Sequence, residues 1–144
     1  MAKTLAVEMV TPDKVALEGR VESIVLPAWD GEYGVLANHA PFLVQLKAGE
    51  VRVTENGVVR RFAISGGFAE GKENKVSLFA ETADMAEALD AEVERQKLEK
   101  AKAEVVRRDL DPTQRMAAEA AMRVAQARLR VSLGVRRRQV DDKR

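Results

Sequence analysis

A short stretch near the N-terminus, residues 26–42, gathers the residue types that acid–base chemistry requires. Its sequence, LPAWDGEYGVLANHAPF, contains Asp30, Glu32, Asn38 and the only histidine of the chain, His39. A carboxylate close to an imidazole can transfer protons, and the same groups can coordinate a metal ion. The glycines and prolines of the stretch favour a second interpretation, a shaped loop that presents a contact surface.

The rest of the chain offers little support for catalysis or metal binding. There is no cysteine and no second histidine, so His39 lacks the further ligands that a metal site normally requires. Ser65, in the sequence SGG, does not fit the nucleophile-elbow pattern of a hydrolase. We therefore expect no catalytic residue, no metal ligand and no required cofactor, and we interpret the loop as a contact surface.

Composition limits the remaining function classes. The chain has 144 residues, of which 46% are hydrophobic and only 4% aromatic, so its core must consist mainly of aliphatic side chains. Its 24 basic residues nearly cancel its 23 acidic ones, which gives no overall attraction to nucleic acid or anionic lipid. No segment approaches the ~20 apolar residues of a membrane span. We expect no direct membrane insertion, and any membrane association must come through a partner.

The first part of the chain has the pattern of short strands. Apolar residues alternate with polar ones from Thr4 to about Glu81, as in TLAVEMV and VRVTENGVVRRFAI, and turn residues separate the runs. The Asn56-Gly57 pair predicts a tight hairpin, because both central residues of a type I′ turn need positive φ. We predict an antiparallel β-sandwich or barrel over residues 1–83, within an α+β fold.

The second part, residues 84–144, has a helical pattern. Neither glycine nor proline occurs from Thr82 to Arg108, and apolar residues recur at helical spacing, which predicts a first helix over that range. Asp111, Pro112 and Gln114 have the spacing of a capping box. They predict a second helix from Pro112 to about Leu133, with Gly134 as its stop. From about residue 134 onward we expect a charged, solvated tail.

The predicted second helix has an apolar face of small residues, which allows close approach of a neighbouring helix. We therefore expect an antiparallel helical hairpin packed through alanine. Such a seam buries little apolar area and stabilises the hairpin weakly compared with a leucine-rich seam, so the hairpin is either a mobile part or a statically docked one. The predicted face consists of Ala117, Ala120, Ala121, Val124 and Ala127.

Several motifs in order resemble the epsilon subunit of bacterial F-type rotary ATP synthases. They are DGEYGVLANHAP, LKAGEVRV, ISGGFAE and the C-terminal helical hairpin, and together they span nearly the whole chain. The sequence departs from the family at Asn38, where glycine is usual, and at Ala48, where proline is common. Asparagine is the least costly substitute if position 38 needs positive φ.

The resemblance implies a non-catalytic subunit of the central stalk. In that family a β-sandwich of about ten strands binds the gamma subunit and the ring of c subunits, and it couples the catalytic head to the proton-driven ring. The loop contains the expected docking positions. By residue-level correspondence they are Asp30, Gly31 and Glu32 for the c ring, and His39, Ala40 and Pro41 for gamma.

The resemblance also implies a regulatory hairpin, which inhibits ATP hydrolysis when it extends toward the alpha and beta subunits. Truncation from about Asp109 should then raise hydrolysis and leave assembly intact. Removal of the sandwich should uncouple hydrolysis from proton movement. The basic residues expected to meet acidic segments of the catalytic subunits are Arg115, Arg123, Arg128 and Arg130.

Some members of the family bind ATP on the folded hairpin through Leu/Ile-Asp-x-x-Arg-Ala and arginines of the second helix. Here Leu89 and Asp90 match, but Val93 and Glu94 replace Arg-Ala, which removes a phosphate-binding donor and adds a negative charge. The candidates for a weak regulatory ATP site are Leu89, Asp90, Arg123 and Arg128.

The resemblance implies a peripheral location on the cytoplasmic face of a bacterial membrane, with the chloroplast thylakoid as an alternative. The sequence leaves open whether the coupling ion is H⁺ or Na⁺. A different functional class, a small nucleic-acid-binding β-barrel with a basic tail, would require exposed aromatic residues interleaved with basic ones on its strands. The few aromatic residues do not show that pattern, so we expect no nucleic acid partner.

Overall fold

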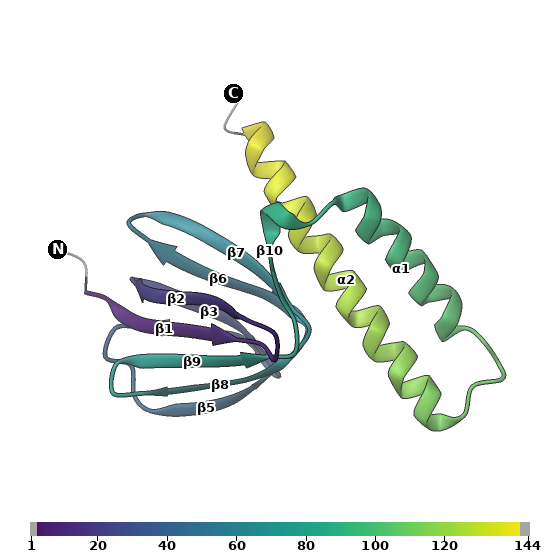
Figure 1. Ribbon diagram of the computed structural model, residues 1–144, viewed down its shortest axis with the longest axis horizontal. Helices are drawn as coiled ribbons and strands as arrows, with labels where there is room; N and C mark the ends of the chain where they lie inside the picture. The colour runs from purple at the N-terminus through teal and green to yellow at the C-terminus, as the bar shows by residue number, and fades with distance from the viewer. Residues whose placement is uncertain (1–2, 142–144) are drawn as a thin grey trace.

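The computed structural model describes residues 3–141, and for residues 135–141 it describes the backbone alone. Ten strands form an N-terminal sandwich, and a helical hairpin follows it (Figure 1). This confirms the predicted α+β class. The strands are β1 (Leu5–Val10), β2 (Val15–Val21), β3 (Ser23–Ala28), β4 (Gly31–Leu36), β5 (Phe42–Leu46), β6 (Gly49–Glu55), β7 (Val58–Ile64), β8 (Gly67–Lys72), β9 (Lys75–Ala80) and β10 (Ala83–Met85).

The strands pair in the order β10-β7-β6-β3-β5-β8-β9-β1-β2, with β4 on β3. A single bridge, from Ala28 to Leu46, joins β3 to β5 and so connects the two halves of the sandwich. One pairing differs from the predicted antiparallel pattern, because β1 runs parallel to β9. The first strand thus pairs with a strand formed much later in the chain, which no local turn signal could predict.

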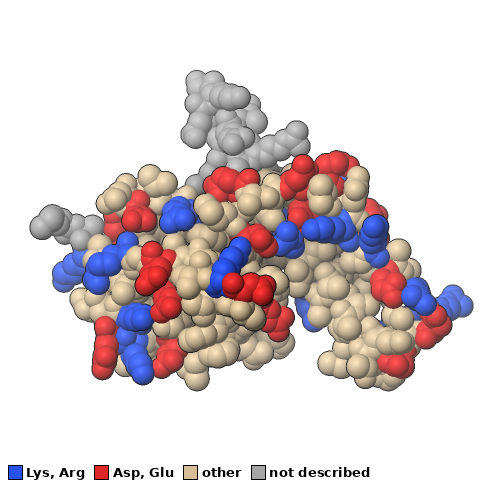
Figure 2. All heavy atoms as spheres, in the orientation of Figure 1, with Lys and Arg blue, Asp and Glu red and all other residues tan. Residues whose placement is uncertain are grey.

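The alternating pattern of the strands places aliphatic residues in one core. Leu5, Val7 and Met9 of β1 are buried, as the alternation predicts. They pack with residues of the other strands, including Ile24, Phe62 and Leu78, in a single apolar cluster. The face of the sandwich seen in Figure 2 carries interspersed positive and negative side chains.

The hairpin predicted at Asn56-Gly57 is present between β6 and β7. Asn56 has φ of 52° and Gly57 has φ of 77°, the positive values that a type I′ turn demands.

The first helix is shorter than predicted. Residues 82–90 are not helical: Ala83–Met85 form β10, which pairs with β7, and Ala86–Ala88 form a short 3₁₀ turn, η1. The helix α1 spans Ala91–Val105, and its first turn is capped by the Asp90 carboxylate, which accepts from the backbone N–H groups of Glu92 and Val93. The prediction of a helix from Thr82 was wrong, because pairing with β7 satisfies the backbone of residues 83–85 instead.

The second helix is longer than predicted. The helix α2 spans Pro112–Asp141 and continues through Gly134, so neither the predicted stop nor the predicted change to a tail at that residue is observed. Glycine weakens a helix by roughly 1 kcal/mol relative to alanine but does not end it unless the backbone turns away. No helix in residues 3–141 is long and apolar enough to cross a membrane.

Capping interactions define the turn between the two helices. The backbone N–H of Gln114 donates to the Asp111 carboxylate, and the N–H of Asp111 donates to the Gln114 side chain, at 2.8 and 3.0 Å. This confirms the predicted capping box. Arg115 donates to the backbone carbonyls of Val105 and Arg107 and so caps the end of α1.

The packing face of α2 differs from the predicted one. Ala117, Ala120 and Ala121 are exposed, and Val124 is half-buried. Of the predicted face only Ala127 is fully buried, and with Val131 it lies on the side that meets β6 and β7. A second covered stripe consists of Ala118, Ala125 and Ser132, which were not predicted. Figure 1 shows the reason, because the N-terminal half of α2 runs away from the sandwich and leaves that part of the predicted face uncovered.

Candidate interaction surfaces and the hairpin junction

The candidate loop residues do not form one site. Strand β4 (Gly31–Leu36) separates them, with Asp30 and Glu32 at its start and Asn38 and His39 beyond its end. At about 3.3 Å per residue, four residues of strand alone span roughly 13 Å. A single acid–base or metal site using both Glu32 and His39 is therefore not assembled. In the described part of the chain, no group of three or more His, Asp or Glu side chains is placed to hold a metal ion.

Glu32 of β4 is held by Arg52 of β6, and both strands pair with β3. Its two carboxylate oxygens accept from Arg52 at 3.1 and 3.2 Å, and Arg52 also contacts Glu50. The hydrogen bond from Arg52 and its positive charge lower the pKa of the exposed Glu32 carboxyl. Glu32 is thus an ionised, oriented group at the end of the sandwich that carries Asp30 and Gly31.

His39 belongs to a small aromatic cluster at the opposite end of β4. Its ring lies 5.5 Å from the Tyr33 ring and 5.3 Å from the Phe42 ring. The Phe42 ring covers Gly71 so closely that any Cβ there would collide with it. The imidazole Nδ1 lies 2.7 Å from the Ala40 carbonyl oxygen. His39 therefore packs in the loop and presents an exposed edge next to Ala40 and Pro41.

Asn38 shapes the approach to His39. It has φ of 62°, so the position does require the left-handed backbone for which asparagine is the least costly replacement of glycine. Its backbone N–H donates to the Asn74 side chain at 2.8 Å.

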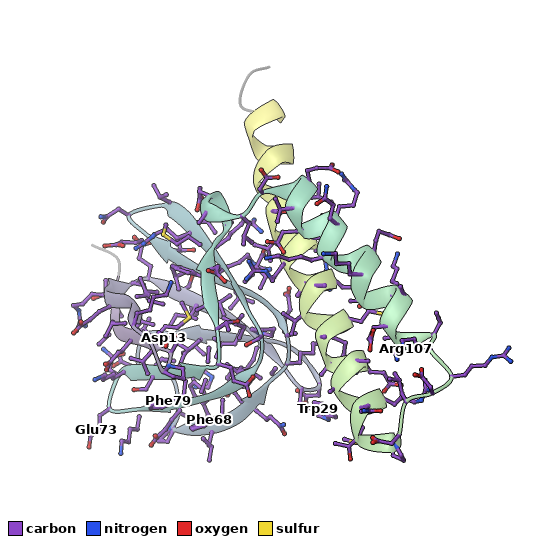
Figure 3. The ribbon with its side chains drawn as sticks, turned by 45° about the vertical axis from the view of Figure 1, so that its right-hand side comes forward. Asp13, Trp29, Phe68, Glu73, Phe79 and Arg107 are labelled. Atoms are coloured by element: carbon purple, nitrogen blue, oxygen red, sulfur yellow. The ribbon has the colours of Figure 1, made fainter. Side chains whose placement is uncertain are left out.

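A further surface was missed by the sequence interpretation. Phe68 of β8 and Phe79 of β9 stack with ring centroids 5.0 Å apart and are 49% and 39% exposed (Figure 3). Leu43, on the adjoining strand β5, is also exposed and points to the same outer face. We call these three residues the apolar β5–β8–β9 surface. The signal was available, because Phe68 and Phe79 occupy outward positions in the alternating pattern.

The hairpin meets the sandwich at a compact junction. Val131 of α2 packs with Ala63 of β7 and with Ala86 and Leu89 of the connecting segment. This contact is small because two of its four members are alanines.

An ion-pair network completes the junction. Arg128 of α2 donates to both carboxylate oxygens of Glu94 on α1, at 2.9 and 3.0 Å, and to Asp84 on β10. Glu94 is only 2% exposed. The hydrogen bonds to Glu94 raise the pKa of Arg128, so the guanidinium stays charged. We call Arg128, Glu94 and Asp84 the junction triad. It ties one strand and both helices together.

The other helical candidates have separate positions. Asp90 caps α1, Leu89 packs in the junction, and Arg115 caps the end of α1. Arg123 and Arg130 lie about 140° and 160° around α2 from Arg128, at 100° per residue. The structure therefore does not bring the four candidate ATP-binding residues to one place. Arg136–Arg138, which contribute to the basic end of the sequence, lie outside the described side chains.

Comparison with known proteins gives a consistent result. Residues 4–86 match the family model of the ATP synthase delta/epsilon chain β-sandwich domain. The ATP synthase epsilon chain of Nitratidesulfovibrio vulgaris is 38% identical over 133 residues, which are 91% of this chain and 97% of that one. The epsilon chain of Symbiobacterium thermophilum is 37% identical over 130 residues, or 89% and 92% of the two chains.

Two solved structures have a similar fold. A chain in the Euglena gracilis mitochondrial ATP synthase, in a structure of OSCP, F1 and the c-ring, matches with a TM-score of 0.76 and 28% identity over 86% of this chain and 78% of that one. A chain of the Tetrahymena thermophila central stalk and c-ring matches with a TM-score of 0.63 and 12% identity, covering 91% and 98%. The second likeness concerns the fold alone. On the family match and the full-length relatives, the chain belongs to the ATP synthase delta/epsilon chain family, as an epsilon chain.

Proposed function

We propose that this chain is a non-catalytic subunit of the central stalk of a rotary ATP synthase. Its sandwich docks on gamma and on the c ring, and its hairpin inhibits ATP hydrolysis when it leaves the sandwich and extends toward the alpha and beta subunits. The complex places it at the cytoplasmic face of a bacterial membrane as a peripheral subunit.

The proposal that the hairpin inhibits hydrolysis rests on the way in which the hairpin is attached to the sandwich. The helices pack mainly against each other, whereas only α2 makes substantial contact with β6 and β7. The attachment consists of the small Val131 cluster and the junction triad. A few apolar contacts and one ion-pair network can be released without opening the sandwich core, so the hairpin can move as a unit.

Three features support the docking part. Glu32 is presented as an oriented carboxylate beside Asp30 and Gly31, which suits contact with the c ring. The exposed edge of His39 lies at the other end of β4, where we propose contact with gamma. The apolar β5–β8–β9 surface exposes aromatic side chains of the kind that protein interfaces bury. The Euglena relative occurs in an assembly that contains F1 and the c-ring.

We propose that ATP binding at the junction is weak or absent in this chain. The guanidinium of Arg128 is already engaged by Glu94 and Asp84, and Asp90 is committed to capping α1. A phosphate group would have to displace the buried Glu94 carboxylate. The junction triad thus provides the stabilisation of the folded hairpin. Isothermal titration of ATP into the full chain tests this point, and tight binding that Arg128→Ala abolishes would contradict it.

The main test is reconstitution with the alpha, beta and gamma subunits of the same ATP synthase. A chain that stops before Asp109 should co-purify with gamma and raise ATP hydrolysis severalfold over the complex with the full chain. Unchanged hydrolysis would remove the inhibitory role. Failure of the full chain to co-purify with gamma would contradict the stalk assignment itself.

A separate variant tests coupling. Glu32→Ala in the complete membrane-bound enzyme should leave hydrolysis by the soluble complex unchanged and reduce ATP-driven proton pumping. Equal pumping by the variant and the original would argue against contact between this loop and the c ring.

A further inference from the structure

A cleft of about 660 Å³ lies between α2 and the sandwich, on a different side of α2 from the junction triad. One wall is α2, with Arg123, Gln126 and Arg130. The other wall is formed by the β3–β4 and β5–β6 turns and by β6 and β7, with Lys47 and Arg61 among its residues. The volume is within the range of small-molecule sites, about 300–1,000 Å³.

The cleft is strongly basic in a chain of net charge +1. Five positive side chains line it and only two carboxylates, Glu32 and Glu50. These carboxylates pair with Arg52 and Arg61. Lys47, Arg123 and Arg130 form no ion pair with any residue whose side chain the structure describes. The positive charge of the cleft is therefore only partly neutralised.

One of the residues that line the cleft contains a buried, unpaired donor. The Nε–H of Arg61, a cleft-lining residue, is shielded from solvent and has no hydrogen-bond partner in the described structure. Its Nη1 is held by Glu50 at 2.7 Å, so the guanidinium is oriented. Buried polar groups are nearly always paired, so this unpaired Nε–H is an exception beside the cleft.

The floor of the cleft leaves room for a ligand. It is formed by small residues of the two turns, Pro27, Gly31, Ala48 and Gly49. Gly49 packs tightly on Pro27, since a Cβ at Gly49 would lie 2.7 Å from the Cβ of that proline. The space between the charged walls is therefore not filled by side chains from below.

We propose that this cleft binds a small anion of the phosphate class, such as inorganic pyrophosphate or another polyphosphate. Arg123 and Arg130 provide guanidinium groups from α2, which bind phosphate oxygens in pairs. Lys47 provides a point charge from the sandwich. The cleft is small, with arginines that are unpaired among the described side chains on one wall and a lysine on the other. Such a cleft can hold a compact polyanion more easily than it can hold a helix or an extended peptide.

The site exists only while the hairpin lies on the sandwich, because its walls belong to both parts. An anion bound there stabilises the folded arrangement through its preferential binding to that state. The site is distinct from the junction, since Arg128 faces α1 and β10. Anion binding at the cleft requires only the folded arrangement of the chain and does not depend on whether the hairpin inhibits hydrolysis.

The chain contains its own reporter of binding. Trp29, the only tryptophan, is 72% exposed in the β3–β4 turn, between the cleft residues Pro27 and Gly31, and Figure 3 shows it on the side of the sandwich toward α2. Titration of the full chain with pyrophosphate should change Trp29 fluorescence in a saturable way and raise the melting temperature of the helices. Since pyrophosphate does not absorb where tryptophan emits, the signal is free of inner-filter effects.

Variants locate the site. Arg123→Ala/Arg130→Ala, at exposed helix positions, should weaken pyrophosphate binding by about tenfold or more, since several charge-assisted contacts are lost. Lys47→Ala should weaken it by a smaller factor, which would show that both walls take part. Arg108→Ala, which removes an exposed arginine at the far end of the hairpin, is the matched control and should bind as the original does.

The outcomes are decisive in both directions. Equal pyrophosphate affinity of the original chain and the Arg123→Ala/Arg130→Ala variant would overturn the proposal. If Arg108→Ala weakened pyrophosphate binding as much as that double variant, the effect would be one of general charge, and the proposal would also be overturned. No saturable change at millimolar pyrophosphate would also overturn it. Titrations with ATP and ADP distinguish the source of the phosphate: a nucleotide that binds no better than pyrophosphate supports a site for the anion alone. If an acidic peptide from a catalytic subunit binds the cleft and pyrophosphate does not, the cleft is a protein contact and the small-anion proposal is wrong.

Discussion

The sandwich and the hairpin are stabilised by different interactions. The sandwich encloses one aliphatic core, in which large side chains such as Phe62, Ile24 and Leu26 are fully buried. Full burial of such a side chain stabilises the fold by roughly 1.5–3 kcal/mol. The hairpin instead buries mainly alanines on α2 and is joined to the sandwich by the Val131 cluster and the junction triad.

The two kinds of interaction differ in how easily they break. A large apolar core opens only when the whole domain unfolds, whereas a small apolar contact with an ion-pair network can break and re-form. The same chain thus contains a rigid docking body and a part that can detach from it.

Phe62→Ala should destabilise the sandwich by about 3–5 kcal/mol, because it leaves a cavity in the core. Chemical denaturation followed by circular dichroism measures the loss. Phe79→Ala is the matched control, since the same residue type is partly exposed there, and its cost should stay below about 1 kcal/mol. Equal costs would mean that the core is not what stabilises the sandwich.

Arg128→Ala should release the hairpin and leave the sandwich folded. The substitution leaves the buried Glu94 carboxylate without its main partner, which costs about 2–3 kcal/mol, less than for a fully buried pair because Arg128 and Asp84 are partly exposed. Hydrogen exchange should show lost protection in α2 and unchanged protection in the strands.

The control for the triad is Arg95→Ala, which breaks the exposed Arg95–Glu92 pair on the outer side of α1. It should change the protection of α2 by less than about 0.5 kcal/mol. If both variants behave alike, the junction triad does not hold the hairpin.

Asp111→Ala should destabilise the start of α2 by about 1 kcal/mol, because it removes one half of the capping box. Faster hydrogen exchange confined to the first turns of α2 is the expected result. Asp109→Ala, which removes a carboxylate that pairs with the exposed Arg107, should have a smaller effect. A uniform loss along α2 would indicate that the cap stabilises the hairpin as a whole.

The smallest effect concerns the titration of Glu32. Its pKa is lowered in the folded state by Arg52, so the pair stabilises the fold above the ordinary pKa of glutamate and loses that contribution as the pH falls through the lowered pKa. NMR titration should give Glu32 a pKa below the usual glutamate range, and Arg52→Gln should restore it. An unchanged pKa in the variant would contradict the pairing in solution.

Local signals in the sequence were reliable where the interaction itself is local. The alternation of β1, the Asn56-Gly57 turn and the Asp111–Gln114 capping box were all predicted, because each depends on residues a few positions apart. The start of α1 could have been found in the same way, since Asp90 is a good N-cap. The apolar spacing of Met85, Leu89 and Val93 favoured a longer helix instead.

Contacts between residues far apart in the sequence could not be predicted from it. The parallel pairing of β1 with β9 joins segments some seventy residues apart. The covered side of α2 depends on where the sandwich ends, so Ala117, Ala120 and Ala121 were predicted to be buried and are exposed. The pairing of Arg128 with Glu94 and Asp84 likewise requires three elements to meet.

The sequence alone thus determined the strand-rich first part, the helical second part, the turn and cap positions and the resemblance to a family, because these depend on composition, period and short-range spacing. The tertiary structure decided which charged residues meet. It separated Glu32 from His39, joined Arg128 to Glu94, and placed Arg123 and Arg130 opposite Lys47 across a cleft. The physical reason is that ion pairs and clefts depend on distances in space, which the chain sets only after its strands and helices have packed.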